Sequence, residues 1–250
     1  MVLSPGRLPA ATGVGRDQQA QGPVRLWKPS RCSMHGYSTD SDEKRIVPLF
    51  LAGLAIALAW MSSNLLATQH FSMPWWMDAP SSMFFYGTLY ALFDRRLWRH
   101  PLMRKLGLVK TPNLAGQWQG YLTSSFDNHA KRYGLCVQIV QSWTQISVSL
   151  STATSASWSC VAVIQVSDPD GVALIYQYEN QPLADATRTM HIHFGTAMLR
   201  ASDGNKLTGD YYAGRDRGTF GRISCCRLPR TIEQALGVLR PRLTGSSWHQ

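Results

Sequence analysis

Residues Ile46 to Leu66 read IVPLFLAGLAIALAWMSSNLL and contain no charged side chain. At about 1.5 Å of rise per residue, a helix over this stretch is about 30 Å long, which matches the hydrocarbon core of a bilayer. Soluble folds rarely contain such a stretch, so we expect a transmembrane helix. The stretch begins more than forty residues into the chain and has no convincing small-residue cleavage site, which argues against a signal peptide.

A second apolar stretch runs from Trp75 to Phe93 (WWMDAPSSMFFYGTLYALF). Asp78 and Pro80 interrupt its start, so we place Asp78 and the Trp75-Trp76 pair in the headgroup layer. As the partner of the first stretch, it is expected to form a second transmembrane helix.

Basic residues predict the orientation of both helices. Lys44 and Arg45 precede the first helix, whereas the connection from Ala67 to Met77 contains no Lys or Arg. A basic cluster follows the second helix: Arg95, Arg96, Arg99, Arg104, Lys105 and Lys110. Both termini are therefore expected in the cytoplasm, with two spans across the membrane. We interpret the cluster as a stop signal that touches lipid rather than as a nucleic-acid site.

The net charge of +10 over 250 residues suggests a nucleic-acid partner, but its location argues against one. Between Asn113 and Cys226 the chain has eight basic and eight acidic residues, so this part is formally neutral. Binding of DNA or RNA through counterion release is therefore not expected. An anionic ligand of this part has to be small and held by locally placed donors.

From Pro112 onward the hydrophobic pattern has a period of two, with turn residues between short segments. Asp168 to Gly171 and Ser202 to Asn205 have the composition of hairpin turns. Eight strands are predicted, at 116–124, 133–141, 145–152, 155–164, 173–178, 190–199, 206–213 and 219–228. A meander of this length closes into a barrel that is filled or holds one small ligand. The fold class is a membrane-anchored all-β protein, with two N-terminal transmembrane helices followed by an eight-stranded antiparallel β-barrel.

Four regions follow from this pattern. Residues 1–42 are rich in Gly, Pro, Ser, Arg and Gln and are expected to be disordered, with Met34 as a hypothetical alternative translation start. Residues 43–110 contain the two helices and the basic cluster, and residues 111–228 form the barrel. Residues 229–250 form a tail, in which Thr231 to Leu239 have the capping pattern of a short helix.

Catalytic motifs are absent from the sequence: it has no GxSxG, GxxxxGK or HExxH. His191 and His193 are spaced to share one face of a strand, but no third zinc ligand stands at a suggestive distance. The five cysteines form no CxxC pair and are typical of thiols in a reducing compartment. We therefore expect no enzyme activity, no catalytic residue, no metal and no cofactor.

Two features of the barrel suggest an inner face. In GQWQG, Trp118 and Gly120 share a strand face, where the Trp closes one end and the Gly admits a neighbouring backbone. Arg215 and Arg217 also share a parity, and two guanidinium groups at the barrel mouth suit a phosphodiester. Pairing of these arginines with Asp210 and Asp216 on a solvated hairpin is an equally good interpretation.

The ordered set of features resembles a known family. The segments are PNLAGQWQGYL (112–122), IVQSWTQISVSLSTATSAS (139–157), LIYQYENQP (174–182), HIHFGTAMLR (191–200) and LTGDYYAGRDRGTFG (207–221). Behind two membrane spans, they resemble the two-transmembrane, β-strand-rich effectors of bacterial CBASS anti-phage systems, of the CD-NTase-associated protein 15 type. The resemblance covers residues 43–228.

This resemblance implies an effector of antiviral defence. A partner CD-NTase makes a cyclic dinucleotide, and the cytoplasmic barrel binds it. Binding drives self-association through the transmembrane helices, and disruption of the inner membrane leads to abortive infection. The residues alone leave two other classes open: a membrane-tethered, lipocalin-like carrier of a small apolar ligand, and a lipid-modifying enzyme that uses His191 or His193.

Candidate ligand contacts are chosen by their expected position near the barrel mouth. Tyrosines would stack on bases, hydroxyls would bond phosphate or base edges, and arginines would meet phosphates. The candidates are Tyr121, Ser124, Ser125, Thr154, Ser155, Tyr178, Asn180, Arg215, Arg217 and Thr219.

Overall fold

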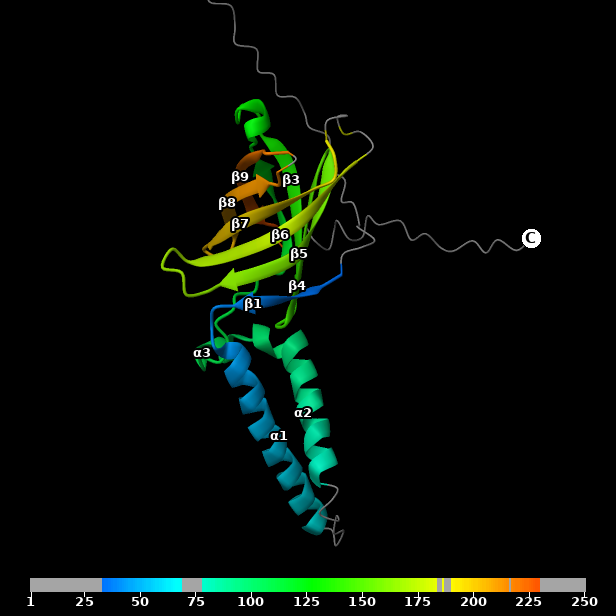
Figure 1. The fold of residues 1–250 in the computed structure, drawn as a ribbon. Coiled ribbons are helices and arrows are strands. Elements are labelled where there is room, and N and C mark those ends of the chain that lie inside the picture. The colour runs from blue at the N-terminus through cyan, green and yellow to red at the C-terminus, as the bar shows by residue number, and fades with distance from the viewer. Residues whose placement is uncertain (1–32, 69–77, 184–185, 187–189, 216, 230–250) are drawn as a thin grey trace, which may run out of the picture.

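The computed structural model describes residues 33–68, 78–183, 186, 190–215 and 217–229. Figure 1 shows a β-barrel above two long helices. The elements are β1 His35–Thr39, α1 Glu43–Thr68, α2 Asp78–Arg95, η2 Leu97–Arg99, α3 Pro101–Lys105, β2 Gly116–Leu122, η3 Ser125–Asp127, β3 Tyr133–Gln141, β4 Gln145–Thr152, β5 Ser155–Gln165, β6 Val172–Pro182, β7 His193–Ser202, β8 Lys206–Ala213 and β9 Phe220–Arg227. Trp75, Trp76 and the helix expected from Thr231 to Leu239 lie outside the described residues, so the structure does not test these expectations.

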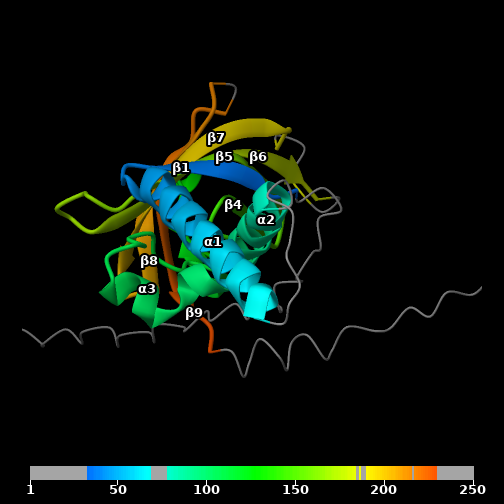
Figure 2. The same cartoon turned by 90° about the horizontal axis from the view of Figure 1, so that it is seen from below.

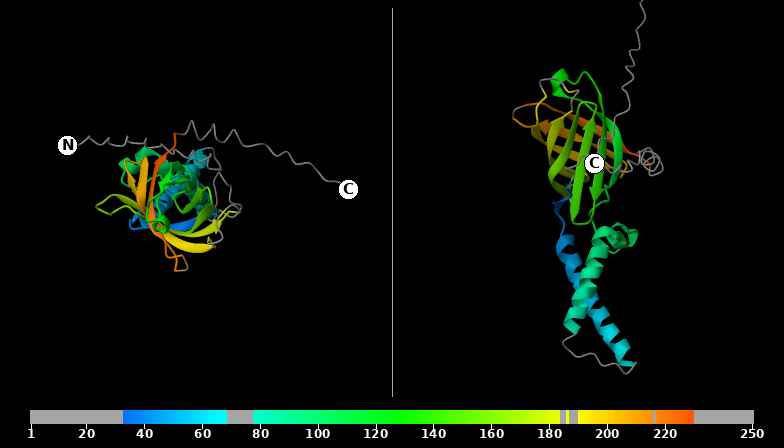
Figure 3. Two further views of the ribbon diagram at one scale, coloured as in Figure 1. Left: turned by 90° about the horizontal axis from the view of Figure 1, so that it is seen from above. Right: turned by 90° about the vertical axis from the view of Figure 1, so that its right-hand side faces the viewer.

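Helix α1 is the one helix in the described ranges that is long and apolar enough to cross a bilayer, with a mean hydropathy of 2.0 in its most apolar 18-residue stretch. Its large side chains face outward, as in Leu49, which is 75% exposed. Helix α2 is shorter and packs along α1, and Figure 3 shows the two helices crossing below the barrel. Small residues of α1, Ala55 and Ala59, are buried.

The strands close into a barrel of nine members in the order β1-β4-β3-β2-β9-β8-β7-β6-β5. The expected number of eight was wrong because β1 precedes the first helix in the chain. This strand pairs antiparallel with β4 (His35 with Ile146) and parallel with β5 (Tyr37 with Ala162), so the barrel is not wholly antiparallel. The expectation that residues 1–42 are disordered was also wrong for residues 35–42. There Tyr37 is buried in the core, and the Asp40 carboxylate accepts bonds from the backbone of β5's continuation at Val166 and Ser167.

The eight expected strands are all present, and β3, β4 and β8 have the predicted bounds. Strand β6 continues through the polar residues up to Pro182 because they pair with β5, and Pro182 lies opposite Ser155. Strand β7 begins at His193 rather than at Met190. Between β7 and β8 a three-residue loop separates Ser202 from its partner Lys206. Asp203 and Gly204 both have positive φ there, and the nitrogen of Asn205 donates to the carbonyl of Ser202 (3.3 Å).

The half of the barrel next to the helices is filled with side chains. Trp118 is fully buried there, and its indole nitrogen donates to the carbonyl of Leu114 (3.1 Å). On the same strand, a Cβ at Gly120 would lie 2.0 Å from the carbonyl oxygen of Ser224. The GQWQG segment therefore has the structural role expected of it, in which the Trp fills the barrel and the Gly allows β9 to approach.

Two carboxylates fasten the helices to this floor. Glu43, at the start of α1, accepts bonds from the backbone nitrogens of Lys110 (2.6 Å) and Thr111 (3.0 Å) and from the Thr111 hydroxyl. Asp94, near the end of α2, accepts from the backbone nitrogen (2.8 Å) and hydroxyl (2.7 Å) of Thr144 and from the Ser142 hydroxyl (3.0 Å). Both ends of the helix pair are thus bonded to the barrel.

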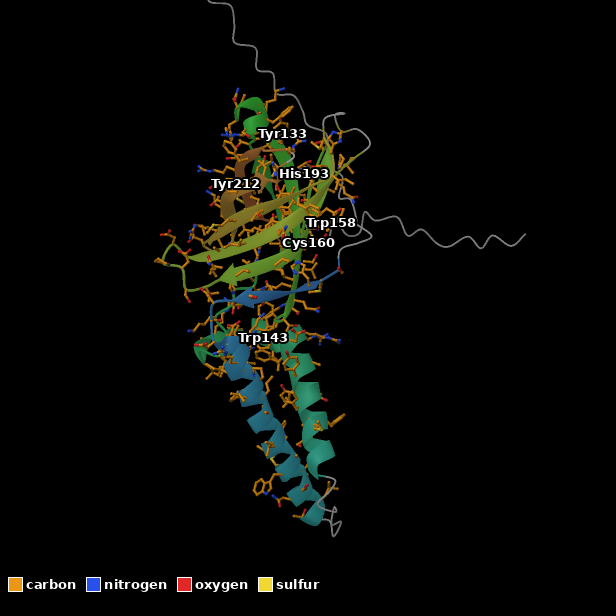
Figure 4. All side chains as sticks on the ribbon, viewed as in Figure 1. Tyr133, Trp143, Trp158, Cys160, His193 and Tyr212 are labelled. Carbon is orange, nitrogen blue, oxygen red and sulfur yellow. The ribbon has the colours of Figure 1, made fainter. Side chains whose placement is uncertain are left out.

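An aromatic cluster fills the space between the two carboxylates. Trp143, at the tip of the β3–β4 hairpin, contacts Phe93 edge to face, with ring centroids 5.1 Å apart. It is buried together with Val47, Leu51 and Trp98. Figure 4 shows Trp143 where the helices meet the barrel. The β3–β4 hairpin therefore packs between the barrel ends of the two helices and joins them to the barrel.

Replacement of Asp94 tests this junction. We expect Asp94→Ala to lower the free energy of unfolding by about 2 kcal/mol, because three donors lose a charged acceptor. The measurement is thermal unfolding of the full chain in detergent. Asp210→Ala is the control, since Asp210 pairs with Arg222 on the exposed barrel surface, and should cost at most about 0.5 kcal/mol. Equal losses in both variants would contradict the fastening role.

Candidate ligand-binding site

The half of the barrel remote from the helices is hollow. It encloses a cavity of about 340 Å³, within the range of small-molecule sites. Strand β3 runs from the helix junction to the cavity rim, about 25 Å at ~3.3 Å per residue. Figure 4 shows Tyr133 and His193 at this far end. The lining residues are Leu122, Ser124, Phe126, Tyr133, Gly134, Leu150, Thr152, Ala153, Thr154, Ser155, Ser157, Tyr176, Tyr178, Asn180, Met190, His193, Tyr211, Arg217, Thr219 and Ile223.

A polar belt crosses three neighbouring strands of the cavity wall. Ser157 of β5 lies opposite Asn180 of β6, which in turn lies opposite His193 of β7. Asn180 is only 7% exposed, and its side chain faces the cavity. The Nδ1 atom of His193 bonds to the carbonyl oxygen of His191 (2.9 Å), so the neutral ring keeps Nε2 as an acceptor. The belt therefore offers both donors and acceptors to a ligand.

Hydroxyl groups gather at the turn between β4 and β5. The Thr152 hydroxyl accepts from the backbone nitrogens of Thr154 (3.3 Å) and Ser155 (3.0 Å) and lies 3.1 Å from the Ser155 hydroxyl. The carbonyl of Thr154 accepts from the nitrogen of Leu183, which ties the turn to the end of β6. These bonds fix the turn before any ligand arrives.

Arg217 supplies the positive charge of the cavity. It is the one Lys or Arg among the described lining residues, and none of them is acidic. Its guanidinium carbon lies 5.8 Å from the ring centroid of Phe126, which comes from the β2–β3 loop. The rim of the cavity is thus formed by two loops that meet through a cation and an aromatic ring.

Buried tyrosines form the deeper wall. Burial raises the pKa of Tyr176 and of Tyr178 above the usual range, and the pKa of Tyr211 is also raised by burial, so all three hydroxyls stay protonated. Gly195 lies beside Tyr178, and a Cβ there would come within 2.4 Å of the phenolic oxygen. Because Gly195 has no side chain, the Tyr178 ring can lie directly against the backbone of β7.

The cavity brings together seven of the ten candidate residues: Ser124, Thr154, Ser155, Tyr178, Asn180, Arg217 and Thr219. The other three lie outside its lining. Tyr121 is on the outer face, where Arg132 stacks on its ring at 4.6 Å. The Ser125 hydroxyl accepts from the backbone nitrogen of Phe220 (3.0 Å) and so holds the β2–β3 loop to β9.

Arg215 is exposed to solvent because β8 ends at Ala213. Residues beyond that point form a turn, in which the nitrogens of Arg217 and Gly218 both donate to the carbonyl of Gly214. The strand parity that grouped Arg215 with Arg217 therefore does not apply. Asp210 pairs with Arg222 (3.3 Å) rather than with either arginine, and Asp216 lies outside the described residues.

Several lining residues were not among the candidates. Phe126 is 63% exposed and comes from a loop in which Asn128 and His129 both have positive φ. Its signal in the sequence is an aromatic residue next to a capping serine, since the nitrogen of Phe126 donates to the Ser124 hydroxyl. His193 was considered as a metal ligand or as a catalytic residue, whereas the structure pairs it with Asn180 in the cavity wall.

No group of three or more His, Cys, Asp or Glu side chains suited to a metal occurs in the described part of the chain. His191 precedes β7, so it does not share a strand face with His193 as expected. Among the described cysteines, Cys136 and Cys225 are buried and Cys160 and Cys226 are exposed, and all four are free thiols.

Comparison with known proteins agrees with this architecture. The family described as "Cap15, cyclic dinucleotide receptor domain" matches residues 109–227, and "Cap15, TM helices" matches residues 45–99. The chain is also similar to CD-NTase-associated protein 15 of Yersinia aleksiciae. The two sequences are 31% identical over 196 residues, which cover 73% of this chain and 88% of the relative. The chain therefore belongs to the Cap15 family of membrane-anchored, β-rich CBASS effectors with a cyclic dinucleotide receptor domain.

Proposed function

We propose that the cavity binds one cyclic dinucleotide made by a partner CD-NTase. The observation that carries this proposal is the hollow, polar-rimmed half of the barrel, with Arg217 as its one cation and no acidic side chain among the described lining residues. A small ligand with two phosphodiester charges fits this electrostatic environment, whereas long nucleic acids do not fit a cavity of about 340 Å³ in a neutral barrel. An apolar cargo would leave the Asn180 amide and the Nε2 atom of His193 without partners, which disfavours the lipocalin-like carrier.

The contacts divide into three kinds. Arg217 meets a phosphate, assisted by the hydroxyls of Thr154, Ser155 and Thr219. Phe126 and Tyr178 offer ring faces for the two bases, because aromatic rings stack on any base. Asn180 and His193 offer hydrogen bonds to a base edge.

Ligand binding then acts on the membrane-embedded part. We place α1 and α2 as two spans of the inner membrane, with both termini in the cytoplasm. Because Glu43 and Asp94 fasten the helices to the barrel, any association of ligand-bound barrels also brings their helices together. Assembly of the helices disrupts the inner membrane and leads to abortive infection, without a catalytic step.

Arg217→Ala tests the ligand site. Loss of a charged hydrogen-bond donor should weaken cyclic dinucleotide binding by about 10- to 100-fold, equivalent to about 1.5–3 kcal/mol. Isothermal titration of the full chain in detergent measures this, since a fragment that starts at residue 111 lacks β1. Arg215→Ala is the matched control because Arg215 is exposed outside the cavity, and its affinity should stay within about twofold. Similar losses in both variants, or in neither, would refute this assignment.

Binding should also depend on pH through His193. Burial, and secondarily the charge of Arg217, lower the pKa of His193, so the ring is neutral in the free protein. A doubly anionic ligand raises that pKa, so binding takes up a proton and the affinity increases as the pH falls. We expect a gain of up to about tenfold between pH 8 and pH 6. His193→Gln should abolish this slope, and an unchanged slope would exclude His193 as its source.

Ligand should convert the full chain from small to large assemblies. Light scattering in detergent measures the size, and dye release from reconstituted vesicles measures membrane damage. Because it binds ligand more weakly, Arg217→Ala should need about 10- to 100-fold more ligand for either response. Assembly without dye release would separate self-association from membrane disruption and contradict the proposed sequence of events.

A further inference from the structure

The segment between α2 and the barrel, residues 95–110, is strongly basic. It reads RRLWRHPLMRKLGLVK, with six Lys and Arg residues and no acidic residue. All six are exposed, and none takes part in the ion pairs found within the described residues. We call residues 95–110 the juxtamembrane segment.

This segment also exposes two leucines that the fold does not use. Leu102, in α3, is 49% exposed, and Leu106, four residues later, is 59% exposed. Their apolar neighbours behave differently, since Met103 and Leu108 pack against the buried cluster around Trp98. Residues four apart lie on one side of a helical turn, so the two leucines form a small apolar face among basic side chains.

The height of the segment relative to the bilayer follows from Glu43. The lipid-exposed apolar side chains of α1 begin at Ile46, which is 52% exposed and lies three residues after Glu43, about 4.5 Å along the axis. Glu43 bonds to the backbone of Lys110, so the segment lies at the boundary of the hydrocarbon. Figures 1 and 2 show α3 beside the upper end of α1, displaced sideways from the helix pair.

We propose that the juxtamembrane segment lies in the headgroup layer of an anionic leaflet, with Leu102 and Leu106 inserted and the basic side chains on lipid phosphates. Exposed leucines flanked by Lys and Arg are typical of interfacial helices, and each basic residue adds to the attraction of an anionic surface. A second copy of the chain is a less suitable partner for the juxtamembrane segment, because two identical basic segments repel one another. This contact gives the barrel a fixed orientation toward the membrane. It depends on insertion of α1 and not on ligand binding.

The test uses a fluorescent probe on the full chain in vesicles. Cys32→Ser, Cys160→Ser and Cys226→Ser remove the other target thiols, and buried Cys136 and Cys225 remain. Burial raises the pKa of the Cys225 thiol to about 12, which suppresses its labelling. Leu106→Cys is then labelled with bimane. The matched control retains Cys160 instead, an exposed thiol on the barrel. Vesicles contain phosphatidylcholine alone or with phosphatidylglycerol, plus lipids that carry a quencher at shallow depth.

In anionic vesicles, we expect quenching at position 106 to exceed that at Cys160 by at least about twofold. Arg104→Gln with Lys105→Gln should reduce the excess to below about half. Equal quenching at both positions would overturn the proposal. Quenching that changes neither with the lipid charge nor with the two substitutions would also overturn it. A probe response that depends on protein density rather than on the quencher would overturn it as well. Resistance of the protein to alkaline extraction verifies insertion of α1 separately, and cyclic dinucleotide titration of the same samples reports the proposed ligand site independently.

Discussion

The bonds of two carboxylates, buried Glu43 and half-buried Asp94, to neighbouring backbone donors are the constraint on which the architecture depends. Glu43 and Asp94 stand at the barrel ends of two different helices, and each bonds to a different part of the barrel floor. Together with the buried cluster around Trp143, these bonds hold the helix pair against the barrel. The two helices are thus attached to the barrel at two separate points.

The two ends of the barrel differ: one is filled and contacts the helices, and the other contains the cavity. The floor is filled by large side chains such as Trp118 and Trp143 and serves as a rigid base. The far end is hollow and is lined by tyrosine and phenylalanine rings, aliphatic side chains, hydroxyls, an amide, an imidazole and one guanidinium. Binding groups at the far end therefore stand about 25 Å from the helices. A ligand at that distance acts by altering what the barrel contacts, since the floor leaves little freedom to move.

The alternation of side chains was sufficient to predict eight strands, because one face of each is buried and a strand's side-chain period is two. The same pattern missed β1, since HGYST is short and mostly polar and is separated from its partners by more than one hundred residues. Seven of the ten candidate residues line the cavity, because turn residues such as Thr154 and Ser155 lie at a barrel rim even when the exact strand bounds are not known. Arg215 was wrongly expected in the cavity because side chains stop alternating between two faces where a strand ends. Phe126 was missed because its loop has no repeating side-chain pattern.

The position of β1 constrains how the protein is made. A ribosome releases this strand first, but its partners β4 and β5 emerge only after both helices have been synthesised. The nascent barrel therefore cannot close before the helices have had the opportunity to enter the translocon. Synthesis order thus favours receptors that are already anchored when they become complete, and it disfavours a pool of finished barrels loose in the cell.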